Sequence, residues 1–128
     1  MKTTQQYPRP KGRRKERGVM NTTERRFLNE VILPRTIDGD VVLWWYEAYS
    51  WKLTEKTPDG KPGIRYTPDF VCMLDTGELV VYEVKGVGNA RRQDLNRVKL
   101  FADAFPFRVY VARQQSKREG GGFDVEEY

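Results

Sequence analysis

Residues 66–86 read YTPDFVCMLDTGELVVYEVKG, and the fold of the chain is organised around this stretch. Residues 70–74 and 79–84 are apolar apart from Glu83, and they are rich in valine. Pro68 stands before the first run, and the turn signal Asp75-Thr76-Gly77 separates the two runs. This pattern predicts two antiparallel β-strands joined by a tight turn.

Three ionisable residues stand within or directly before these strands, namely Asp69, Glu83 and Lys85. Charged groups among apolar residues cost free energy unless they are paired or have a function. Side chains alternate along a strand, so Glu83 and Lys85 share one face. A three-residue loop with Gly77 in the left-handed conformation places Asp69 opposite Glu83, whereas a two-residue loop sends Asp69 to the other face. We expect the three-residue loop.

The same register predicts two faces that are both largely apolar, as in central strands covered on two sides. One face is formed by Asp69, Val71, Met73, Leu79, Val81, Glu83 and Lys85. The other face is formed by Phe70, Cys72, Leu74, Val80, Tyr82 and Val84.

Composition limits the classes of protein to which the chain can belong. At 128 residues it is long enough for one domain with a real core. No apolar run reaches the ~20 residues of a membrane span, and no apolar leader is present, so we expect a cytoplasmic protein. The single cysteine, Cys72, excludes a disulfide framework and is expected to be a small buried hydrophobe.

The absence of histidine limits the chemistry further. With one cysteine and no histidine, zinc fingers, His-metal nucleases and Ser-His-Asp catalysis are excluded. A metal ion would need oxygen ligands, which suits Mg²⁺ or Mn²⁺. We expect no nucleotide cofactor and no membrane partner.

The net charge of +5 is concentrated near the N-terminus. Residues 1–20 hold seven Lys/Arg and the single acid Glu16, and they carry Pro and Gly without periodicity. We interpret this segment as a flexible basic arm that binds nucleic acid, although a solubilising or disordered tail has the same composition. The DNA contacts that we predict in it are Arg13, Arg14, Lys15 and Arg17.

A helix is predicted to begin at residues 21–24, which read Asn-Thr-Thr-Glu, and to end before Pro34. Apolar residues at positions 27, 28, 31 and 32 follow at helical spacing. Glu24 lies at the edge of this apolar stripe. A first-turn acid favoured by the helix dipole and an inward-facing metal ligand are both open interpretations of Glu24.

A long strand is predicted over residues 41–53, after a turn at residues 38–40. Its aromatic residues favour core or interface positions over base stacking. Glu47 is the one acid inside this strand and is a reserve candidate for the site. Residues 54–63 are polar and contain two turn signals, Pro58-Asp59-Gly60 and Pro62-Gly63. This composition predicts a surface loop or hairpin tip.

An amphipathic helix is predicted over residues 90–104, with Leu95, Val98, Ala102 and Phe105 as its buried line. A further strand follows over residues 107–112. The basic side chains of this helix are Arg91, Arg92, Arg97 and Lys99. They form either a solvated face or a set of contacts with DNA phosphates.

The predicted fold class is α/β, a mixed β-sheet flanked by helices in the order αβββαβ. The domain covers residues 21–113, between the basic arm at residues 1–20 and a polar, acidic tail at residues 114–128 that we expect to be mobile.

Two carboxylates brought together need a counter-charge, which a divalent cation supplies. Such a cation activates water and stabilises the leaving oxygen of a phosphodiester. Two acids and a lysine around a metal are therefore suited to phosphodiester cleavage.

On these residues the chain resembles the PD-(D/E)XK nuclease superfamily, which has a restriction-endonuclease-like core. Pro68-Asp69 and Glu83-Val84-Lys85 match its signature, and the predicted element order matches its core. The resemblance covers residues 21–112. It implies that Asp69 and Glu83 ligate Mg²⁺ with the Val84 carbonyl as an additional ligand. It also implies that Lys85 positions or deprotonates the attacking water, or stabilises the transition state.

Many members of this superfamily use a glutamate from the first helix, and Glu24 occupies that place. The resemblance therefore favours Glu24 over Glu47 as the additional site residue. Gln93 matches a polar position that some members use near the metal. The small size, the basic arm and the Glu-Val-Lys-Gly stretch look most like phage-type endonucleases, including Holliday junction resolvases.

This narrower resemblance implies a phage-encoded homodimer that acts on branched DNA in the cytoplasm of a bacterial host. A less selective nuclease of recombination or packaging and a non-catalytic DNA-binding protein are the alternatives. No module that reads base sequence is visible, which favours recognition of DNA shape or backbone.

Deleting residues 1–18 is predicted to weaken DNA binding and to flatten its salt dependence, because these cations release counterions from phosphates. The slope of log K against log salt should fall by about 0.9 for each phosphate that the arm neutralises in the intact protein. An unchanged slope would identify a passive tail.

Overall fold

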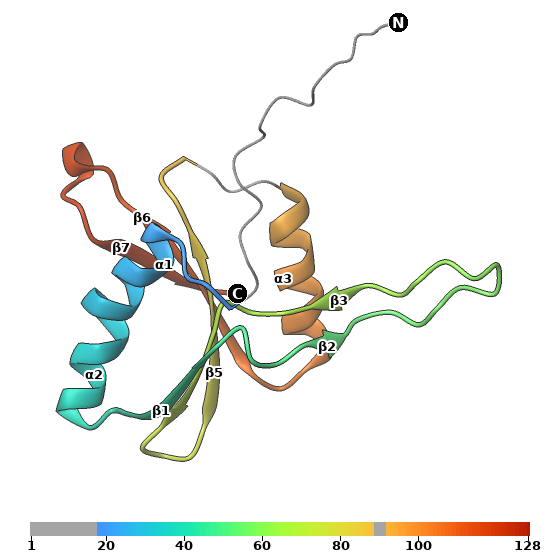
Figure 1. Cartoon of the computed structure of the whole chain (residues 1–128), viewed down its shortest axis with the longest axis horizontal. Coiled ribbons are helices and arrows are strands. Elements are labelled where there is room, and N and C mark those ends of the chain that lie inside the picture. Colours follow the sequence, from blue (N-terminus) through green and yellow to red (C-terminus); the bar gives the residue numbers. More distant parts are fainter. Residues whose placement is uncertain (1–17, 89–91) are drawn as a thin grey trace, which may run out of the picture.

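A computed structural model describes residues 18–88 and 92–128, with side chains from residue 95 onward in the second range. It has a five-stranded mixed sheet with helices on both faces (Figure 1). The elements are α1 (Thr22–Phe27), η1 (Leu28–Ile32), α2 (Leu33–Asp38), β1 (Val41–Tyr46), β2 (Trp51–Lys52), β3 (Arg65–Tyr66), β4 (Phe70–Leu74), β5 (Leu79–Lys85), α3 (Arg92–Ala104), β6 (Arg108–Gln114), η2 (Lys117–Glu119) and β7 (Phe123–Glu127).

The strand order in the large sheet is β1-β4-β5-β6-β7. The β5–β6 pair is parallel and is joined by the crossover helix α3, while the other pairs are antiparallel. A parallel pair needs such a crossover, whereas antiparallel neighbours can be joined by short turns. The chain is therefore a mixed α/β protein, as the sequence predicts.

The central hairpin has the predicted three-residue loop. The N–H of Leu74 donates to the carbonyl of Glu78 at 2.8 Å, and Gly77 has a φ of 87°. Phe70 pairs with Tyr82, so the next position toward the N-terminus, Asp69, lies opposite Glu83 in the same register. The register on which the candidate site depends is thus present.

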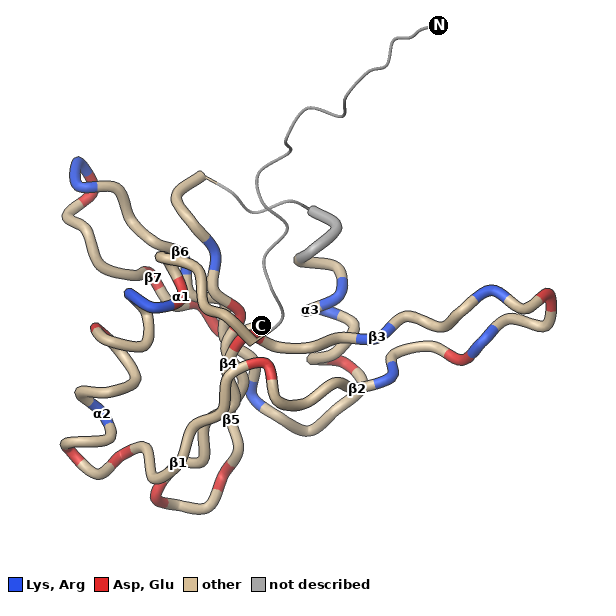
Figure 2. The backbone as a smooth tube through the Cα atoms, viewed as in Figure 1, with Lys and Arg blue, Asp and Glu red and all other residues tan. Residues whose placement is uncertain are grey.

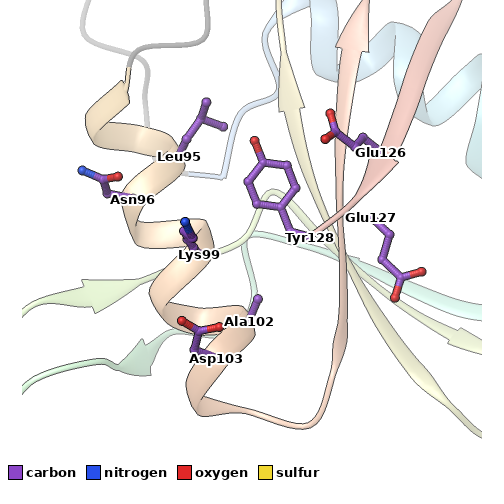
Figure 3. Close-up of a pocket in the computed structure, with 8 residues that line it drawn as sticks. All are labelled: Leu95, Asn96, Lys99, Ala102, Asp103, Glu126, Glu127 and Tyr128. Carbon is purple, nitrogen blue, oxygen red and sulfur yellow. The ribbon is translucent and has the colours of Figure 1, made fainter.

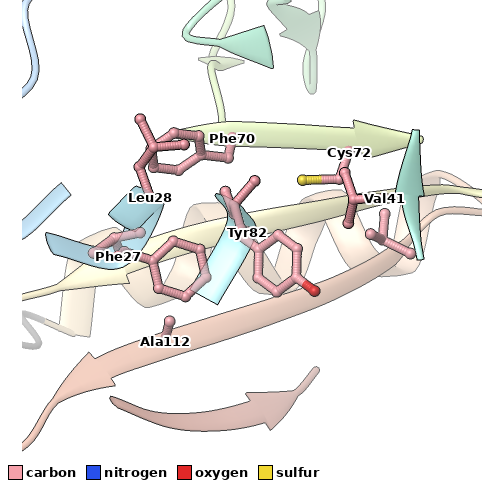
Figure 4. Close-up of a cluster of buried hydrophobic side chains, with 10 residues drawn as sticks. Phe27, Leu28, Val41, Phe70, Cys72, Tyr82 and Ala112 are labelled. Atoms are coloured by element: carbon pink, nitrogen blue, oxygen red, sulfur yellow. The ribbon is translucent and has the colours of Figure 1, made fainter. Parts of the chain in front are cut away.

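Both predicted faces of the hairpin are confirmed. One face packs against α1 and η1 in a cluster that contains Phe27, with its ring centroid 5.2 Å from that of Tyr82 (Figure 4). The other face packs against α3, where Val98 and Phe101 are fully buried. The predicted buried line of α3 lies in this second cluster, to which Phe101 is an addition. Cys72 is fully buried in the first cluster, and burial raises the pKa of its thiol to about 12.

The first helix does not end before Pro34, so that prediction was wrong. Helical structure continues through η1 and α2 to Asp38, where Gly39 closes it with a φ of 88°. The segment η1 is π-helical, and the N–H of Leu33 donates to the carbonyl of Leu28, five residues back. Pro34 follows directly, at the first turn of α2, where a missing N–H is tolerated.

The predicted strand over residues 41–53 is interrupted. β1 ends at Tyr46, and Glu47 adopts a φ of 47°, which turns the chain out of the sheet. β2 then pairs with β3 in a separate two-stranded sheet whose tip, residues 54–63, is the predicted loop. After this turn the Trp51 ring packs on Phe101 of α3, at a centroid distance of 5.1 Å, within the second core cluster.

The C-terminal segment is not an irregular tail, contrary to our expectation. β7 pairs antiparallel with β6 and forms an edge of the sheet. Phe123 anchors it, with its ring 5.2 Å from that of Phe27. The acidic residues of β7 concealed the strand in the sequence, but charged side chains are common on an edge strand because they oppose edge-to-edge association. No helix in the described part of the chain is long and apolar enough to cross a membrane.

Replacing Phe101 with alanine should destabilise the protein by about 3–5 kcal/mol, because the ring is fully buried and contacts Phe105 and both strands of the β2–β3 hairpin. Its neighbour Leu100 is 46% exposed, and Leu100→Ala should change stability by no more than about 0.5 kcal/mol. Urea denaturation followed by circular dichroism measures both. Equal losses would contradict the packing described for α3.

Candidate metal centre

Three carboxylates converge where α1 begins, β1 ends and β4 begins. Glu24, Glu47 and Asp69 each offer one oxygen, and these oxygens lie within 4.8 Å of one another. The residues come from three segments that are separate in sequence. We name these three residues the carboxylate cluster. A cluster of this kind can hold a metal ion.

Glu24 is held at the first turn of α1 by a reciprocal capping box. The Asn21 side chain accepts from the Glu24 N–H at 2.8 Å, and Glu24 Oε1 accepts from the Asn21 N–H at 2.9 Å. The Tyr46 hydroxyl donates to the same Glu24 oxygen at 2.8 Å. Glu24 is only 4% exposed. The two interpretations of Glu24 are therefore compatible, because this acid both caps the helix and faces the carboxylate cluster.

Glu47 reaches the carboxylate cluster through its unusual backbone. A positive φ is uncommon for a residue other than glycine and costs of the order of 1 kcal/mol or more. The Glu47 N–H donates to the carbonyl of Asp69 at 3.0 Å, and Glu47 Oε1 accepts from the Gly18 N–H at 3.1 Å. The first bond holds the end of β1 and the start of β4 together where two of the carboxylates meet, and the second ties the Glu47 side chain to the segment before α1.

Asp69 connects the carboxylate cluster to β5. Its Oδ2 accepts from the Val84 N–H at 2.7 Å. Burial raises the pKa of Asp69 well above its ordinary value, and the negative charges of Glu83 and Glu24 raise it further. The Val84 N–H acts in the opposite direction. An acid in such surroundings is costly to ionise, and a bound cation offsets that cost. The donor set therefore fits a hard, oxygen-binding metal ion.

Glu83 lies next to Asp69 in register, but its carboxylate is not one of the three oxygens of the carboxylate cluster. Glu83 Oε1 accepts from the Tyr66 hydroxyl at 2.7 Å, and Oε2 lies 2.9 Å from Lys85 Nζ. The side chains of Glu83 and Lys85 are only 12% and 11% exposed. Burial and the charge of Glu83 raise the pKa of Tyr66, so its hydroxyl stays a proton donor.

Of the predicted DNA contacts, the structure describes the side chains of Arg97 and Lys99. Arg97 is exposed on α3. Lys99 borders a cleft of about 410 Å³ between α3 and the end of β7 (Figure 3). Three acids share this cleft with Lys99, namely Asp103, Glu126 and Glu127. The surroundings of Lys99 are therefore negative, and its contact with DNA stays a prediction. Residues outside the described part are Arg13, Arg14, Lys15, Arg17 and Arg91, and the side chains of Arg92 and Gln93.

Sequence reasoning did not identify Tyr46 and Tyr66 as part of the site. Each donates a hydrogen bond to a candidate carboxylate. Tyr46 directly precedes Glu47, and Tyr66 stands three residues before Asp69, but tyrosine is common in strands and neither spacing is diagnostic. Only the tertiary structure, which brings Tyr46 to Glu24 and Tyr66 to Glu83, reveals their partners.

Comparison with known proteins yields no relative: no family model, no curated protein and no solved structure matches the chain.

Replacing Asp69 with asparagine should stabilise the metal-free protein near neutral pH. The folded chain resists ionising Asp69, so its contribution to stability is complete below the ordinary Asp pKa of about 4 and is lost as pH rises through the raised value. Asparagine keeps an oxygen for the Val84 N–H and does not titrate. Thermal unfolding in EDTA should give similar midpoints near pH 4 and a growing advantage of Asp69→Asn toward pH 8.

The exposed acid Asp103 provides the matched control, because Asp103→Asn should follow the unaltered protein at every pH. Adding Mn²⁺ should raise the unfolding midpoint of the unaltered protein more than that of Asp69→Asn, since a ligand at 100 times its Kd contributes about 2.7 kcal/mol. An Asp69→Asn midpoint below that of the unaltered protein at pH 8 would contradict the environment described for Asp69.

Proposed function

We propose that this protein is a Mg²⁺-dependent DNA endonuclease that recognises branched DNA by its shape. The observation that carries the proposal is the convergence of the carboxylate cluster beside a largely buried Glu83–Lys85 pair. Asp69, an acid with a raised pKa, together with two further carboxylates and a nearby lysine forms a site for a divalent cation and a phosphate group. The basic composition, with a sequence pI of about 9.4, suits a polyanionic partner.

The arrangement of elements supports the same proposal. The order α1–β1–β4–β5–α3–β6 is the αβββαβ order of a restriction-endonuclease-like core, if the β2–β3 hairpin is treated as an insertion and β7 as an addition. The resemblance of Pro68-Asp69 and Glu83-Val84-Lys85 to the PD-(D/E)XK signature agrees with this order. Fold alone does not establish chemistry, so the proposal depends on the site residues.

Glu24, Glu47 and Asp69 would hold the cation, and Glu83 with the Val84 carbonyl would extend the ligand set toward β5. The Val84 N–H, the Tyr46 hydroxyl and the Tyr66 hydroxyl fix the orientation of these acids. A bound Mg²⁺ or Mn²⁺ supplies charge neutralisation at the phosphate and lowers the pKa of attacking water.

Lys85 acts in this proposal as a fixed positive charge. Its ammonium group lies 2.9 Å from a Glu83 oxygen in surroundings that exclude most solvent, and a lysine in such an ion pair is charged. A charged ammonium cannot accept a proton from water. Of the roles that the resemblance implies for Lys85, the geometry therefore favours stabilisation of the negative transition state over general-base catalysis.

Replacing Lys85 with alanine should reduce Mg²⁺-dependent cleavage by about 100-fold or more, because the transition state loses its fixed cation. DNA binding should stay within a few-fold of the unaltered protein. The substrates are a four-way junction and nicked, flapped and linear duplexes of the same sequence, each incubated with Mg²⁺ and with EDTA. The exposed lysine at position 117 gives the control, and Lys117→Ala should cleave normally.

Because Lys85→Ala leaves the Glu83 carboxylate without this partner, Glu83→Gln serves as a second variant that keeps the Tyr66 hydrogen bond. Circular dichroism establishes that each variant is folded. Full cleavage by Lys85→Ala, or cleavage in EDTA, would refute the proposed chemistry. Equal cleavage of all substrates would replace the branched-DNA preference with a less selective nuclease, and binding of DNA with no cleavage would support a non-catalytic protein.

A further inference from the structure

The β2–β3 hairpin, residues 51–66, extends directly from the carboxylate cluster. Glu47 lies four residues before its first strand, and Asp69 lies three residues after its second. The Glu47 N–H donates to the Asp69 carbonyl at 3.0 Å, and this hydrogen bond joins the two ends of the segment. The hairpin therefore begins and ends at two candidate ligands, and it projects away from the central sheet (Figure 1).

The hairpin has a defined conformation along its length. At its base, the rings of Trp51 and Tyr66 each lie 5.1 Å from the ring of Phe101. Farther out, the Leu53 N–H donates to the Ile64 carbonyl at 2.7 Å. At the tip, the Thr57 N–H donates to the carbonyl of Lys61 at 3.0 Å. Within residues 18–88 and 92–128, the core clusters include hairpin residues from its base alone, so folding of the core does not explain the ordered, polar outer part.

The two backbones of the hairpin come unusually close at Gly63. A Cβ atom at this position would lie 2.1 Å from the carbonyl oxygen of Thr54, so no other residue fits without a shift of the backbone. The Ile64 N–H beside it donates to the Thr54 hydroxyl at 2.8 Å. This contact holds the two chains of the hairpin together beyond β2 and β3.

Cations outnumber acids on this hairpin. Lys52, Lys56, Lys61 and Arg65 are all exposed, and the acids between them are Glu55 and Asp59. Figure 2 shows basic and acidic segments interspersed along the projecting hairpin. Lys52 pairs with Glu55 at 2.9 Å and Lys61 with Asp59 at 3.8 Å. Exposed pairs of this kind are weak and exchange readily when a stronger anion approaches.

One side of the hairpin is hollowed. The hollow has a volume of about 480 Å³, and three cations border it together with the single acid Glu55. The cations are Lys52, Lys56 and Arg65. The Arg65 guanidinium is oriented by two hydrogen bonds of 3.1 Å, to the hydroxyl and the carbonyl of Ser50. Oriented cations around a concave surface suit phosphate oxygens, which accept from several donors at once.

We propose that the β2–β3 hairpin is a phosphate-binding arm that holds the DNA backbone beside the carboxylate cluster. This inference rests on the proposed nuclease function and adds to it the surface that positions the substrate. The carboxylate cluster repels phosphates when no cation is bound, so an adjacent basic surface has to bring the backbone close. At ~3.3 Å per residue, residues 51–57 reach about 20 Å, which spans several phosphates of a duplex.

A protein or membrane partner fits this surface less well. Ile64, at 40% exposure, is the one exposed large apolar side chain between residues 52 and 65, a range that the structure describes in full. Protein interfaces depend on buried aromatic and apolar anchors, and membrane insertion needs an apolar face. The exposed aromatic Tyr49 lies before the hairpin and packs on Trp51, with a ring centroid distance of 6.0 Å.

The test is the double variant Lys56→Ser/Lys61→Ser, made in the Asp69→Asn background so that DNA is not cleaved. Its control is Lys117→Ser/Arg118→Ser, which removes two exposed cations from η2, far from residues 51–66 in the sequence. Binding to a four-way junction and to a linear duplex is measured in Mg²⁺ over a range of salt concentrations. The hairpin variant should lose on the order of tenfold in affinity, and its salt slope should fall by about 1.8, whereas the control keeps the parent slope.

A second variant tests the same surface in the opposite direction. Glu55→Gln/Asp59→Asn removes the acids that pair with Lys52 and Lys61, so DNA binding should become tighter. A misfolded hairpin would not produce this gain. When the same hairpin substitutions are made in the chain that keeps Asp69, the Mn²⁺-induced rise in melting temperature should be retained, since the carboxylate cluster is then unchanged.

The outcomes separate the two proposals. The phosphate-binding arm would be overturned if the hairpin variant and its control had equal affinity and equal salt slope. The nuclease proposal would stay in place if the Asp69→Asn parent still bound DNA and the unaltered chain still cleaved it. Absence of both DNA binding by the parent and cleavage by the unaltered chain would overturn both. Weaker DNA binding with a smaller salt slope in the hairpin variant, but not in its control, supports the phosphate-binding arm.

Discussion

The hydrogen bond from the Val84 N–H to Asp69 joins the central hairpin to the candidate site. It forms because the three-residue loop after β4 sets a register in which Asp69 lies beside the end of β5. The same register directs one face of the strands to α1 and the other to α3. A shift of one residue would reverse both faces, so the cores and the site depend on one loop.

The site concentrates negative charge where the fold can partly compensate for it. Glu24 accepts from backbone at the first turn of α1, and Glu83 is held by Tyr66 and Lys85. Burial and the acidic neighbours of Asp69 both raise its pKa. Native proteins keep such costly arrangements mainly at functional sites, which is why the carboxylate cluster supports a function more strongly than the fold does.

The positive φ of Glu47 links the architecture to this chemistry. It ends β1, directs a carboxylate toward Asp69, and sends the chain into the β2–β3 hairpin. The segment returns to the sheet only at Asp69. Consequently the hairpin cannot move at its base without disturbing two carboxylates. A substrate held along the hairpin would therefore be held in a fixed relation to the carboxylate cluster.

The sequence by itself determined the central hairpin, its loop, the two apolar faces and the α/β class, because period-two apolar patterns and glycine turns are local signals. It also selected Asp69, Glu83 and Lys85 as the residues to examine, and it left Glu24 and Glu47 as alternatives. The tertiary structure brought Glu24 and Glu47 to Asp69 together. It also carried the helix through Pro34, broke the strand at Glu47 and paired β7 with β6. Each of these depends on contacts between segments distant in sequence, and local pattern carries no information on such contacts.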